Sequence, residues 1–589
     1  MGVNTGLGSW YVDVGSVRII DLTTGTDLDE KLREIPYKGG WHSDTKREYL
    51  PGTRVEYMDY IVNWVDNPDS KRGLVLVGQA GTGKSSIAHE IARLFRGMNR
   101  LSSYFVFQRA ERPKREDYLF FTTLVHDLSN RYPSFKIALG KVIRNNKHLR
   151  TANDYHTLFE NVLLQSLKDL RIVGPILVIV DALDESGDAT DRKGLHTFLA
   201  EHVSELPSTF RILITSRLES NIVDPFTKAS KAFQIIRMDD SELSARTNED
   251  IQVYLATVLP SNIYQKHGSA LAKKAEGLFQ WAAVACGYIN DPPRGLTKND
   301  CIRGLLGLSA PHEELGQKLG PLYDLYKQVL EGYFNANIVQ RRFQSVMGQL
   351  LAAFEPLSID SLTTLRQYSP DDDDDDDDSV IAIVGHLGSL LSNATSADRT
   401  LPITPLHTSF RDFLTDRKTS GDFNVDLDEA HRQLAHSCVG LMLRDLKFNI
   451  CKLESSYLPN KGISDLQPRI NEHIAPALLY SCRYWNDHLG RLWFEQDLFV
   501  KIQSLFEGKF LFWLEVLSLT NAVSIATPAL LSLKAWLASD RNNDQVCPRI
   551  QYSDLKANRY YNRLLEINRR NSRAWLPKPL HFCSVSGWP

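Results

Sequence analysis

A glycine-rich octapeptide near residue 80 constrains this chain more than any other feature. It matches the pattern G-x-x-x-x-G-K-[ST] at every fixed position: Gly78-Gln79-Ala80-Gly81-Thr82-Gly83-Lys84-Ser85. Gly81 and Gly83 permit positive φ and a close backbone approach, so that successive N–H groups can point at phosphate oxygens. The pattern is typical of loops that bind the phosphates of a nucleotide.

The sequence on both sides of this loop fits the same interpretation. An apolar strand, Leu74–Val77, precedes the loop, and residues 85–96 follow with helical spacing of their apolar side chains. The N-terminus of that helix adds its dipole to the attraction for phosphate. We therefore predict a nucleotide site from Gly78 to Ser86, in which Lys84 reaches the β- and γ-phosphates and Ser85 ligates Mg²⁺. A glycine-rich turn that binds nothing is the alternative.

A second polar segment follows about a hundred residues later. The apolar run Ile176–Val180 leads directly into Asp181-Ala182-Leu183-Asp184-Glu185. In a parallel sheet this places a carboxylate at the carboxyl edge, beside the metal. We expect Asp181 to hold Mg²⁺ through water, and Asp184 and Glu185 to polarise the attacking water.

A third apolar run also leads directly into polar residues. The apolar run 211–215 ends in Ser216-Arg217. A cation at that strand tip would lie close to the γ-phosphate, so Arg217 is predicted to sense whether this phosphate is present. The alternative is that Arg217 pairs with a surface carboxylate.

The alternation of short apolar runs with helical patterns predicts the fold class. Five runs are expected to be parallel strands covered on both faces, which indicates a doubly wound α/β domain. After about Glu242 helical periodicity takes over, so a mainly α region is expected to follow. The predicted strands are Leu74–Val77, Tyr104–Phe107, Ile176–Val180, Arg211–Thr215 and Phe233–Ile236.

Composition excludes several other classes. Hydrophobic residues make up 43 % and charged residues 24 % of the 589 residues, which excludes wholesale disorder. A net charge of −3 gives no reason to expect a general binder of nucleic acid or of a membrane surface. The seven cysteines are scattered without a CxxC pair, which favours a reducing, cytoplasmic setting. The longest uncharged stretch, Val516–Leu533, is expected to form packed helices and not a membrane span.

Two further features have plain structural interpretations. Eight consecutive aspartates, Asp371–Asp378, are expected to form a solvated loop, with a cation-binding or partner-binding tail as the alternative. The aromatic residues of the C-terminal region are expected to be core and not binding surface. These are Tyr480, Tyr484, Trp485, Phe510, Phe512 and Trp513.

With these segments in hand, the chain resembles the NACHT class of P-loop NTPases, within the STAND signalling group, and most closely its fungal NLR-like members. The segments GQAGTGKSS, ILVIVDALDE and RILITSR are similar to the phosphate-loop, metal and sensor motifs of that class. Leu50-Pro-Gly-Thr-Arg54 and Gly277-Leu-Phe-Gln-Trp281 also resemble the fungal group. The resemblance covers roughly residues 45 to 500, firmly to about residue 290.

The resemblance implies one further site residue. Leu406-His407-Thr408-Ser409-Phe410 resembles the winged-helix motif of NACHT proteins, in which a histidine faces the ADP β-phosphate in the closed form. By that match the histidine is His407; the alternative is a histidine that caps or packs locally. Phe410, Phe413 and Leu414 should anchor the helix in its own small core. Fungal relatives commonly end in a repeat array, and the sequence to Pro589 contains no such repeat.

The expected organisation follows from these motifs. It comprises an N-terminal segment of unknown role (1–45), a NACHT NTPase domain (46–240), a helical domain (241–335), a winged-helix-like domain (336–420) and a C-terminal helical domain (421–589). The favoured function is a switch that binds ATP or ADP with Mg²⁺, hydrolyses ATP slowly and self-associates in its ATP form, with unknown protein partners. A turnover ATPase that remodels or moves other molecules is the alternative, and a kinase is the weakest.

Overall fold

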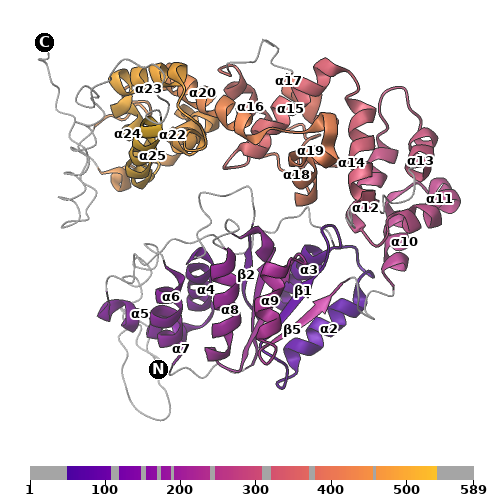
Figure 1. Ribbon diagram of the computed structural model, residues 1–589. Helices are drawn as coiled ribbons and strands as arrows, with labels where there is room; N and C mark the ends of the chain where they lie inside the picture. Colours follow the sequence, from indigo (N-terminus) through magenta and orange to yellow (C-terminus); the bar gives the residue numbers. More distant parts are fainter. Residues whose placement is uncertain are drawn as a thin grey trace, which may run out of the picture. The chain divides into compact units, whose positions relative to one another are not determined.

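A computed structural model describes residues 49–107, 118–146, 154–168, 174–186, 192–238, 246–307, 320–369, 379–455 and 459–539 (Figure 1). The segment 1–45 and the aspartate run Asp371–Asp378 lie outside the described residues. The chain divides into two compact units. Unit 1 comprises Met1–Asn290 and Thr297–Leu322, and unit 2 comprises Asp291–Leu296 and Tyr323–Pro589.

The core of unit 1 is a sheet of five parallel strands in the order β2-β3-β4-β1-β5. All five strands predicted from the sequence are present, each within a few residues of its expected bounds. The register pairs Val77 with Ser216 and Val106 with Asp181, so the carboxyl ends of β1 to β4 meet at one edge. The strands are β1 (Gly73–Val77), β2 (Leu101–Val106), β3 (Ile176–Asp181), β4 (Phe210–Ser216) and β5 (Phe233–Arg237).

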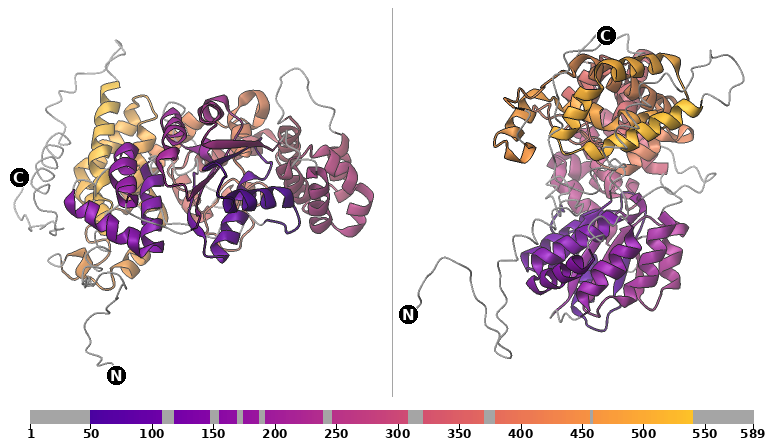
Figure 2. Two further views of the ribbon diagram at one scale, coloured as in Figure 1. Left: turned by 90° about the horizontal axis from the view of Figure 1, so that it is seen from below. Right: turned by 90° about the vertical axis from the view of Figure 1, so that its left-hand side faces the viewer.

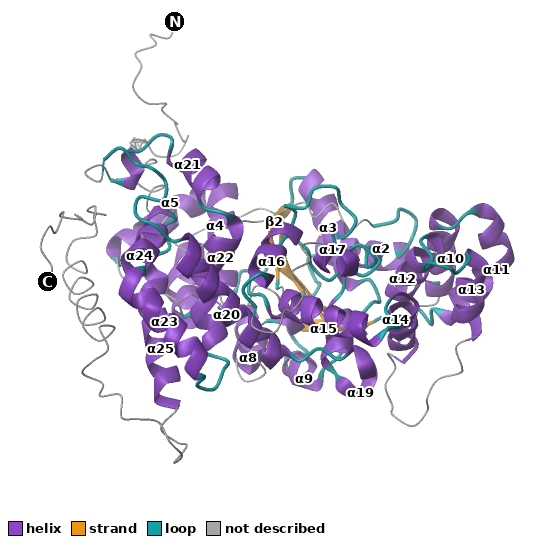
Figure 3. Cartoon of the chain, turned by 90° about the horizontal axis from the view of Figure 1, so that it is seen from above, coloured by secondary structure: helices purple, strands orange, loops and turns teal. Residues whose placement is uncertain are grey.

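Helices cover both faces of this sheet because side chains of successive strand residues point to opposite sides. Leu74 and Leu76 pack on one face with helices α2 (Val55–Asp66) and α3 (Lys84–Gly97). Val75 and Val77 pack on the other face. That second layer contains α4 (Tyr118–Arg131), α5 (Pro133–Asn145), a continuous helix of α6, η4 and α7 (Tyr155–Leu167), α8 (Arg192–His202) and α9 (Ser220–Lys228). Its helices are labelled in Figure 1, four of them again in Figure 3, and Figure 2 gives two further views of the domain.

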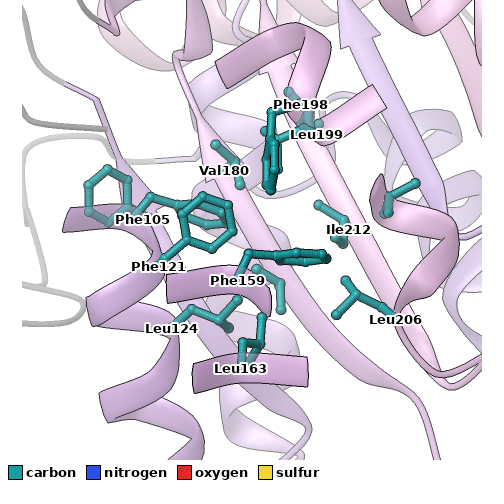
Figure 4. Packing of buried hydrophobic residues seen from close by; sticks show 14 of the residues in the cluster. Phe105, Phe121, Leu124, Phe159, Leu163, Val180, Phe198, Leu199, Leu206 and Ile212 are labelled. Carbon is teal, nitrogen blue, oxygen red and sulfur yellow. The ribbon is translucent and has the colours of Figure 1, made fainter. Parts of the chain in front are cut away.

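The second layer is rich in phenylalanine. Figure 4 shows Phe121 of α4 among the rings of neighbouring elements, with its ring centroid 5.8 Å from those of Phe159 and Phe198. All three side chains are buried, and they fill the space between α4, η4 (Leu158–Leu164) and α8. This layer supports the back of β3, whose carboxyl end carries Asp181.

The buried face of α2 is determined by its aromatic residues. The apolar residues Val55, Met58, Ile61 and Val62 recur at helical spacing in the sequence of α2. The structure instead buries Tyr57, Ile61, Trp64 and Val65, and Val55 is 42 % exposed. The large aromatic rings of Tyr57 and Trp64 bury more apolar area than the aliphatic side chains, so they determine which face packs on the sheet.

Four helices complete the described part of unit 1. They confirm that helix replaces strand after about residue 242. They are α10 (Thr247–Val258), α11 (Ser261–Lys274), α12 (Phe279–Asn290) and α13 (Lys298–Gly307). The fold is therefore a P-loop α/β domain followed by helical regions, as the sequence predicted.

Unit 2 is mainly helical, with isolated antiparallel bridges that join Ser358 to Pro402 and Leu391 to Pro405. The longest of its described helices, α20, packs against α15 and α22. The helices that continue into or lie within this unit are α14 (Gly320–Tyr333), α15 (Asn337–Ala352), α16 (Ile359–Arg366), α17 (Ser379–Val384), α18 (Thr408–Thr415), α19 (Arg417–Ser420), α20 (Leu427–Asp445), α21 (Leu466–His473), α22 (Pro476–Leu489), α23 (Gln496–Gly508), α24 (Phe510–Leu519) and α25 (Ala526–Ser539).

The aromatic cluster of this unit is core, as predicted, apart from one residue. Tyr480, Tyr484, Trp485, Phe510 and Trp513 are at most 5 % exposed. Phe512 is half-buried. The uncharged stretch Val516–Leu533 is divided between α24, a short turn and α25. Within the described ranges, no helix has the length and apolar character needed to cross a membrane.

Candidate functional site

The predicted phosphate loop connects β1 to α3 at the carboxyl edge of the sheet. Gly81 has φ 85° and Gly83 has φ 93°, the left-handed values that the sequence analysis assigned to them. Helix α3 begins at Lys84, so its first N–H groups open toward the loop. Gly78 N–H donates to Ser216 O over 3.4 Å, which joins the start of the loop to the end of β4.

The ammonium of Lys84 folds back onto its own loop. Its Nζ donates to Gly78 O over 2.8 Å and to Gln79 O over 2.7 Å. Burial lowers the pKa of Lys84 to about 8; Asp184 opposes this shift and the nearby cation Arg217 adds to it. A lysine held by two neutral carbonyl oxygens can transfer to phosphate oxygens, since these bear the charge that the carbonyls lack.

Ser85 and Asp181 meet at the position expected for the metal. Ser85 Oγ donates to Asp181 Oδ1 over 2.9 Å, although the two residues are 96 positions apart in the sequence. Asp181 is fully buried. A hydroxyl and a carboxylate oxygen are ligands of the kind that Mg²⁺ prefers, together with water and phosphate oxygens. The donor set therefore fits the implied metal.

Two partners of Asp181 were missed by the sequence analysis. The hydroxyl of Thr215 donates to Asp181 Oδ1 and also accepts the N–H of Ala182 over 2.9 Å. Tyr104 donates its hydroxyl to Asp181 Oδ2 over 3.3 Å. Thr215 follows the apolar run 212–214, and a buried hydroxyl there is a signal that could have identified it. Tyr104 lies in a strand that also contains Ser102 and Ser103, so polarity alone does not single it out.

Asp184 and Arg217 form an ion pair at the same edge. Arg217 Nε lies 2.9 Å from Asp184 Oδ2, and the backbone N–H of Arg217 donates to Oδ1 over 3.1 Å. Asp184 is buried within a short helical turn, Leu183–Glu185, that starts after Ala182 in the left-handed conformation (φ 57°). The carboxylate partner considered for Arg217 is thus a residue of the predicted site. Glu185 is half-buried beside it.

Arg54 and Gln280 hold the back of the phosphate loop, although the sequence predicted no role for either residue. Arg54 Nη2 donates to Thr82 O over 2.9 Å. Gln280 N–H donates to Gly81 O over 3.2 Å. Arg54 and Gln280 lie in the segments Leu50–Arg54 and Gly277–Trp281, which resemble the fungal group. Neither segment has a chemical pattern that indicates a contact with the phosphate loop.

His407 belongs to unit 2, where it is the N-cap of α18. Its Nδ1 accepts the backbone N–H of Ser409 over 3.1 Å. A neutral histidine that accepts at Nδ1 carries its proton on Nε2. Phe410, Phe413 and Leu414 of α18 are buried, as predicted, and Phe410 packs on Tyr326 with ring centroids 5.2 Å apart. A contact between His407 and a nucleotide stays a prediction.

A separate cavity of about 770 Å³ lies at the amino end of β2, lined by residues that include Arg96, Tyr104 and Arg131. Because the phosphate loop lies at the carboxyl end of the strands, this cavity is not the predicted nucleotide site. It contains none of the predicted catalytic or phosphate-binding residues.

One known protein family matches part of unit 1. Residues 58–217 match the family described as "Nephrocystin 3, N-terminal". No curated protein matches the chain. Together, the strand order and the loop geometry define a nucleotide-binding P-loop NTPase, and the family match covers the same part of the chain.

The similarity of the chain to solved structures is low. A STAND protein with a tetratricopeptide repeat sensor from Pyrococcus horikoshii is 13 % identical, over 92 % of this chain and 66 % of that one, with a TM-score of 0.36. This chain therefore spans about two thirds of the length of the archaeal protein. A structure of Drosophila ORC bound to DNA is 12 % identical, over 97 % of this chain and 96 % of that one, with a TM-score of 0.23.

Proposed function

We propose that this protein is a nucleotide-operated signalling switch of the NLR-like kind, which binds ADP or ATP with Mg²⁺. The observation that carries the proposal is the convergence of Lys84, Ser85 and Asp181 at the carboxyl edge of the sheet, with the Ser85–Asp181 hydrogen bond at 2.9 Å. In this scheme the Gly78–Ser86 loop holds the phosphates, Lys84 neutralises their charge, and Ser85 and Asp181 hold the metal. Mg²⁺ would supply charge neutralisation between the β- and γ-phosphates.

The pairing of Asp184 supports slow hydrolysis over rapid turnover. Both carboxylate oxygens of Asp184 are occupied by Arg217, through Nε and the backbone N–H. A general base must accept a proton from the attacking water, and donors at both oxygens make the Asp184 carboxylate less basic, so it accepts that proton less readily until a partner leaves. Rearrangement of Arg217 toward a γ-phosphate would release Asp184, with Glu185 as the second carboxylate available to water.

The remaining parts of the proposal come from the resemblance. The region 336–420 would act as a winged-helix-like domain whose His407 contacts the β-phosphate of ADP in a closed form, and ATP would favour an open, self-associating form. The domains 46–240, 241–335 and 421–589 are proposed with the same bounds as above. A cytoplasmic location agrees with five buried free cysteines among the described residues: Cys286, Cys301, Cys438, Cys451 and Cys482.

Identification of the bound nucleotide tests the proposal directly. The full chain is purified, denatured and analysed for released nucleotide by ion-pair chromatography, with Lys84→Ala as the control. We expect stoichiometric ADP from the wild type and none from the variant. An empty protein that turns over added ATP steadily, above about 1 per second, would instead indicate a motor or remodelling ATPase. An empty protein that neither binds nor hydrolyses ATP would refute both functions.

A further inference from the structure

Two neighbouring carbonyl groups of the phosphate loop are held from outside the loop. Gly81 O accepts from Gln280 N–H at the start of α12, and Thr82 O accepts from the guanidinium of Arg54. Each peptide group is planar and trans, so its carbonyl and the following N–H point in opposite directions. Fixing the carbonyls of Gly81 and Thr82 therefore fixes the directions of the Thr82 and Gly83 N–H groups, of which the Thr82 N–H donates to Gln79 O over 3.4 Å within the loop.

The guanidinium of Arg54 is buried, and burial of a charged group costs free energy unless hydrogen bonds compensate for it. Arg54 is 5 % exposed, and burial lowers the pKa of its guanidinium. Its Nη1 donates to Thr247 Oγ1 over 2.6 Å, and its backbone N–H donates to Asp250 Oδ2 over 3.0 Å, both on α10. Its Cζ lies 4.9 Å from the ring centroid of Phe279, at the start of α12. One side chain thus contacts the phosphate loop, α10 and α12.

The backbone around these contacts is shaped to allow them. Arg54 has φ 53°, a left-handed value that is uncommon for a residue with a side chain. Glu276 and Gly277 have φ 48° and 83° in the turn that leads into α12. A Cβ on Gly81 would lie only 2.8 Å from Gln280 Cβ, so glycine is required for α12 to approach the loop so closely.

From these contacts we infer that Arg54 is a positioning residue that couples the phosphate loop to helices α10 and α12. It holds the Thr82 carbonyl while it is itself anchored to Thr247, Asp250 and Phe279. Because coupling free energies are reciprocal, α10 and α12 stabilise the phosphate-binding conformation, and bound phosphate in turn stabilises the packing of α10 and α12. This inference rests on the proposed function, since it assumes that the loop binds a nucleotide.

The test compares Arg54→Met and Arg54→Lys with a matched buried arginine. Arg211 is 3 % exposed and also donates to backbone carbonyls, including Asn67 O at 2.8 Å and Ser208 O at 2.9 Å. It lies at the amino end of β4, whereas the phosphate loop lies beyond the carboxyl end of the neighbouring strand. Arg211→Met therefore destabilises the same domain without touching the loop. ADP affinity is measured by calorimetry on the full chain, and hydrogen exchange of α10 is measured with and without ADP.

We expect Arg54→Met to weaken ADP binding at least tenfold. Arg54→Lys should do the same, because an ammonium lacks the planar fork that spans Thr82 and Thr247. Arg211→Met should change ADP affinity less than threefold. ADP should protect the α10 amides from exchange in the wild type and in Arg211→Met, and this protection should be lost in both Arg54 variants. If Arg54 only stabilised the fold, Arg54→Met and Arg211→Met would have similar effects on ADP affinity and on α10 protection.

Three results would overturn the inference or its premise. A wild type that binds no ADP would refute the proposed function itself. Wild-type affinity and α10 protection in Arg54→Met, or equal weakening of ADP binding in Arg211→Met, would refute the positioning role of Arg54. If Arg54→Met does not fold, Thr247→Val removes one anchor and leaves Arg54 in place; it should weaken ADP binding about threefold, and unchanged affinity and α10 protection there would equally refute the role.

Discussion

Arg217 holds Asp184 through two separate donors, with Nε 2.9 Å from Oδ2 and the backbone N–H 3.1 Å from Oδ1. The pair joins the ends of β3 and β4, where the sequence analysis expected a hydrolytic carboxylate and a phosphate sensor. Separation of the pair would favour both predicted roles, because it would release Nε of Arg217 for a γ-phosphate and Oδ2 of Asp184 for water.

Replacement of Arg217 should therefore affect hydrolysis more than binding. We expect Arg217→Ala to lower the rate of phosphate release from ATP at least tenfold, because a charged hydrogen bond to the γ-phosphate contributes about 1.5–3 kcal/mol. ADP has no γ-phosphate, so its affinity should change less than about threefold. Arg217→Lys, which keeps the charge, should recover part of the rate. Equal hydrolysis by wild type and Arg217→Ala would contradict a sensing role.

The pKa of Lys84 predicts how ADP binding depends on pH. Burial lowers this pKa to about 8 in the empty loop, and bound phosphates would raise it, because they favour the charged ammonium. Binding then requires the protonated lysine, so ADP affinity should be constant below pH 8 and fall by up to about tenfold per pH unit above it. Calorimetry between pH 7 and 9.5 measures this, with Lys84→Arg, which does not titrate there, as the control. An affinity that stays flat to pH 9.5 would contradict it.

Two substitutions of His407 separate capping from ligand contact. Asparagine is a good N-cap residue, so His407→Asn keeps an acceptor for the Ser409 N–H, whereas His407→Ala removes it at a cost of about 1 kcal/mol. Neither variant can present an imidazole Nε2–H. If His407 contacts the β-phosphate, both variants should release ADP several-fold faster and self-associate more. If it only caps α18, the asparagine variant should behave as the wild type in both measurements.

The sequence predicted the elements better than it predicted their contacts. Five strands and the positive φ values of Gly81 and Gly83 follow from local patterns, since apolar runs and a fixed glycine spacing are sufficient. The helical spacing near residue 55 does not show which face of α2 is buried, because this depends on how the rings of Tyr57 and Trp64 pack on the sheet. Thr215 and Tyr104 were missed as partners of Asp181 for a related reason: they approach it only through the register of neighbouring strands.

A buried hydrogen-bonded chain in unit 2 fixes the tautomers of two histidines. Phe354 N–H donates to Tyr480 Oη over 3.1 Å, which leaves the Tyr480 hydroxyl to donate to His488 Nε2 over 2.8 Å. His488 must then carry its proton on Nδ1, from which it donates to His431 Nδ1 over 2.8 Å. His431 Nδ1 is the acceptor at the end of this series of hydrogen bonds. A proton on His431 Nδ1 would place its N–H against the Nδ1–H of His488.

The hydrogen bonds from Phe354 to His431 lead us to predict that unit 2 loses stability in mild acid. Burial lowers the pKa of His431 to about 4 and that of His488 well below its usual value, with Arg491 and Arg411 adding to the shift of His431. Because the unfolded chain takes up protons near pH 6.5 and the folded chain does not, stability is full above about pH 6.5 and falls as the pH decreases toward 4. At pH 5 the loss from His431 alone is about 2 kcal/mol.

Hydrogen exchange of the α22 amides at pH 7.5 and pH 5.0, corrected for the intrinsic exchange rates, measures this loss. The double variant His431→Phe/His488→Phe has no imidazole to titrate at either position, so its protection should decrease less between these pH values than that of the wild type. The difference should reach at least about 2 kcal/mol in opening free energy. An equal decrease in both proteins would assign the acid sensitivity to other groups, such as the carboxylates, and the histidine chain would then be a pH-independent part of the core.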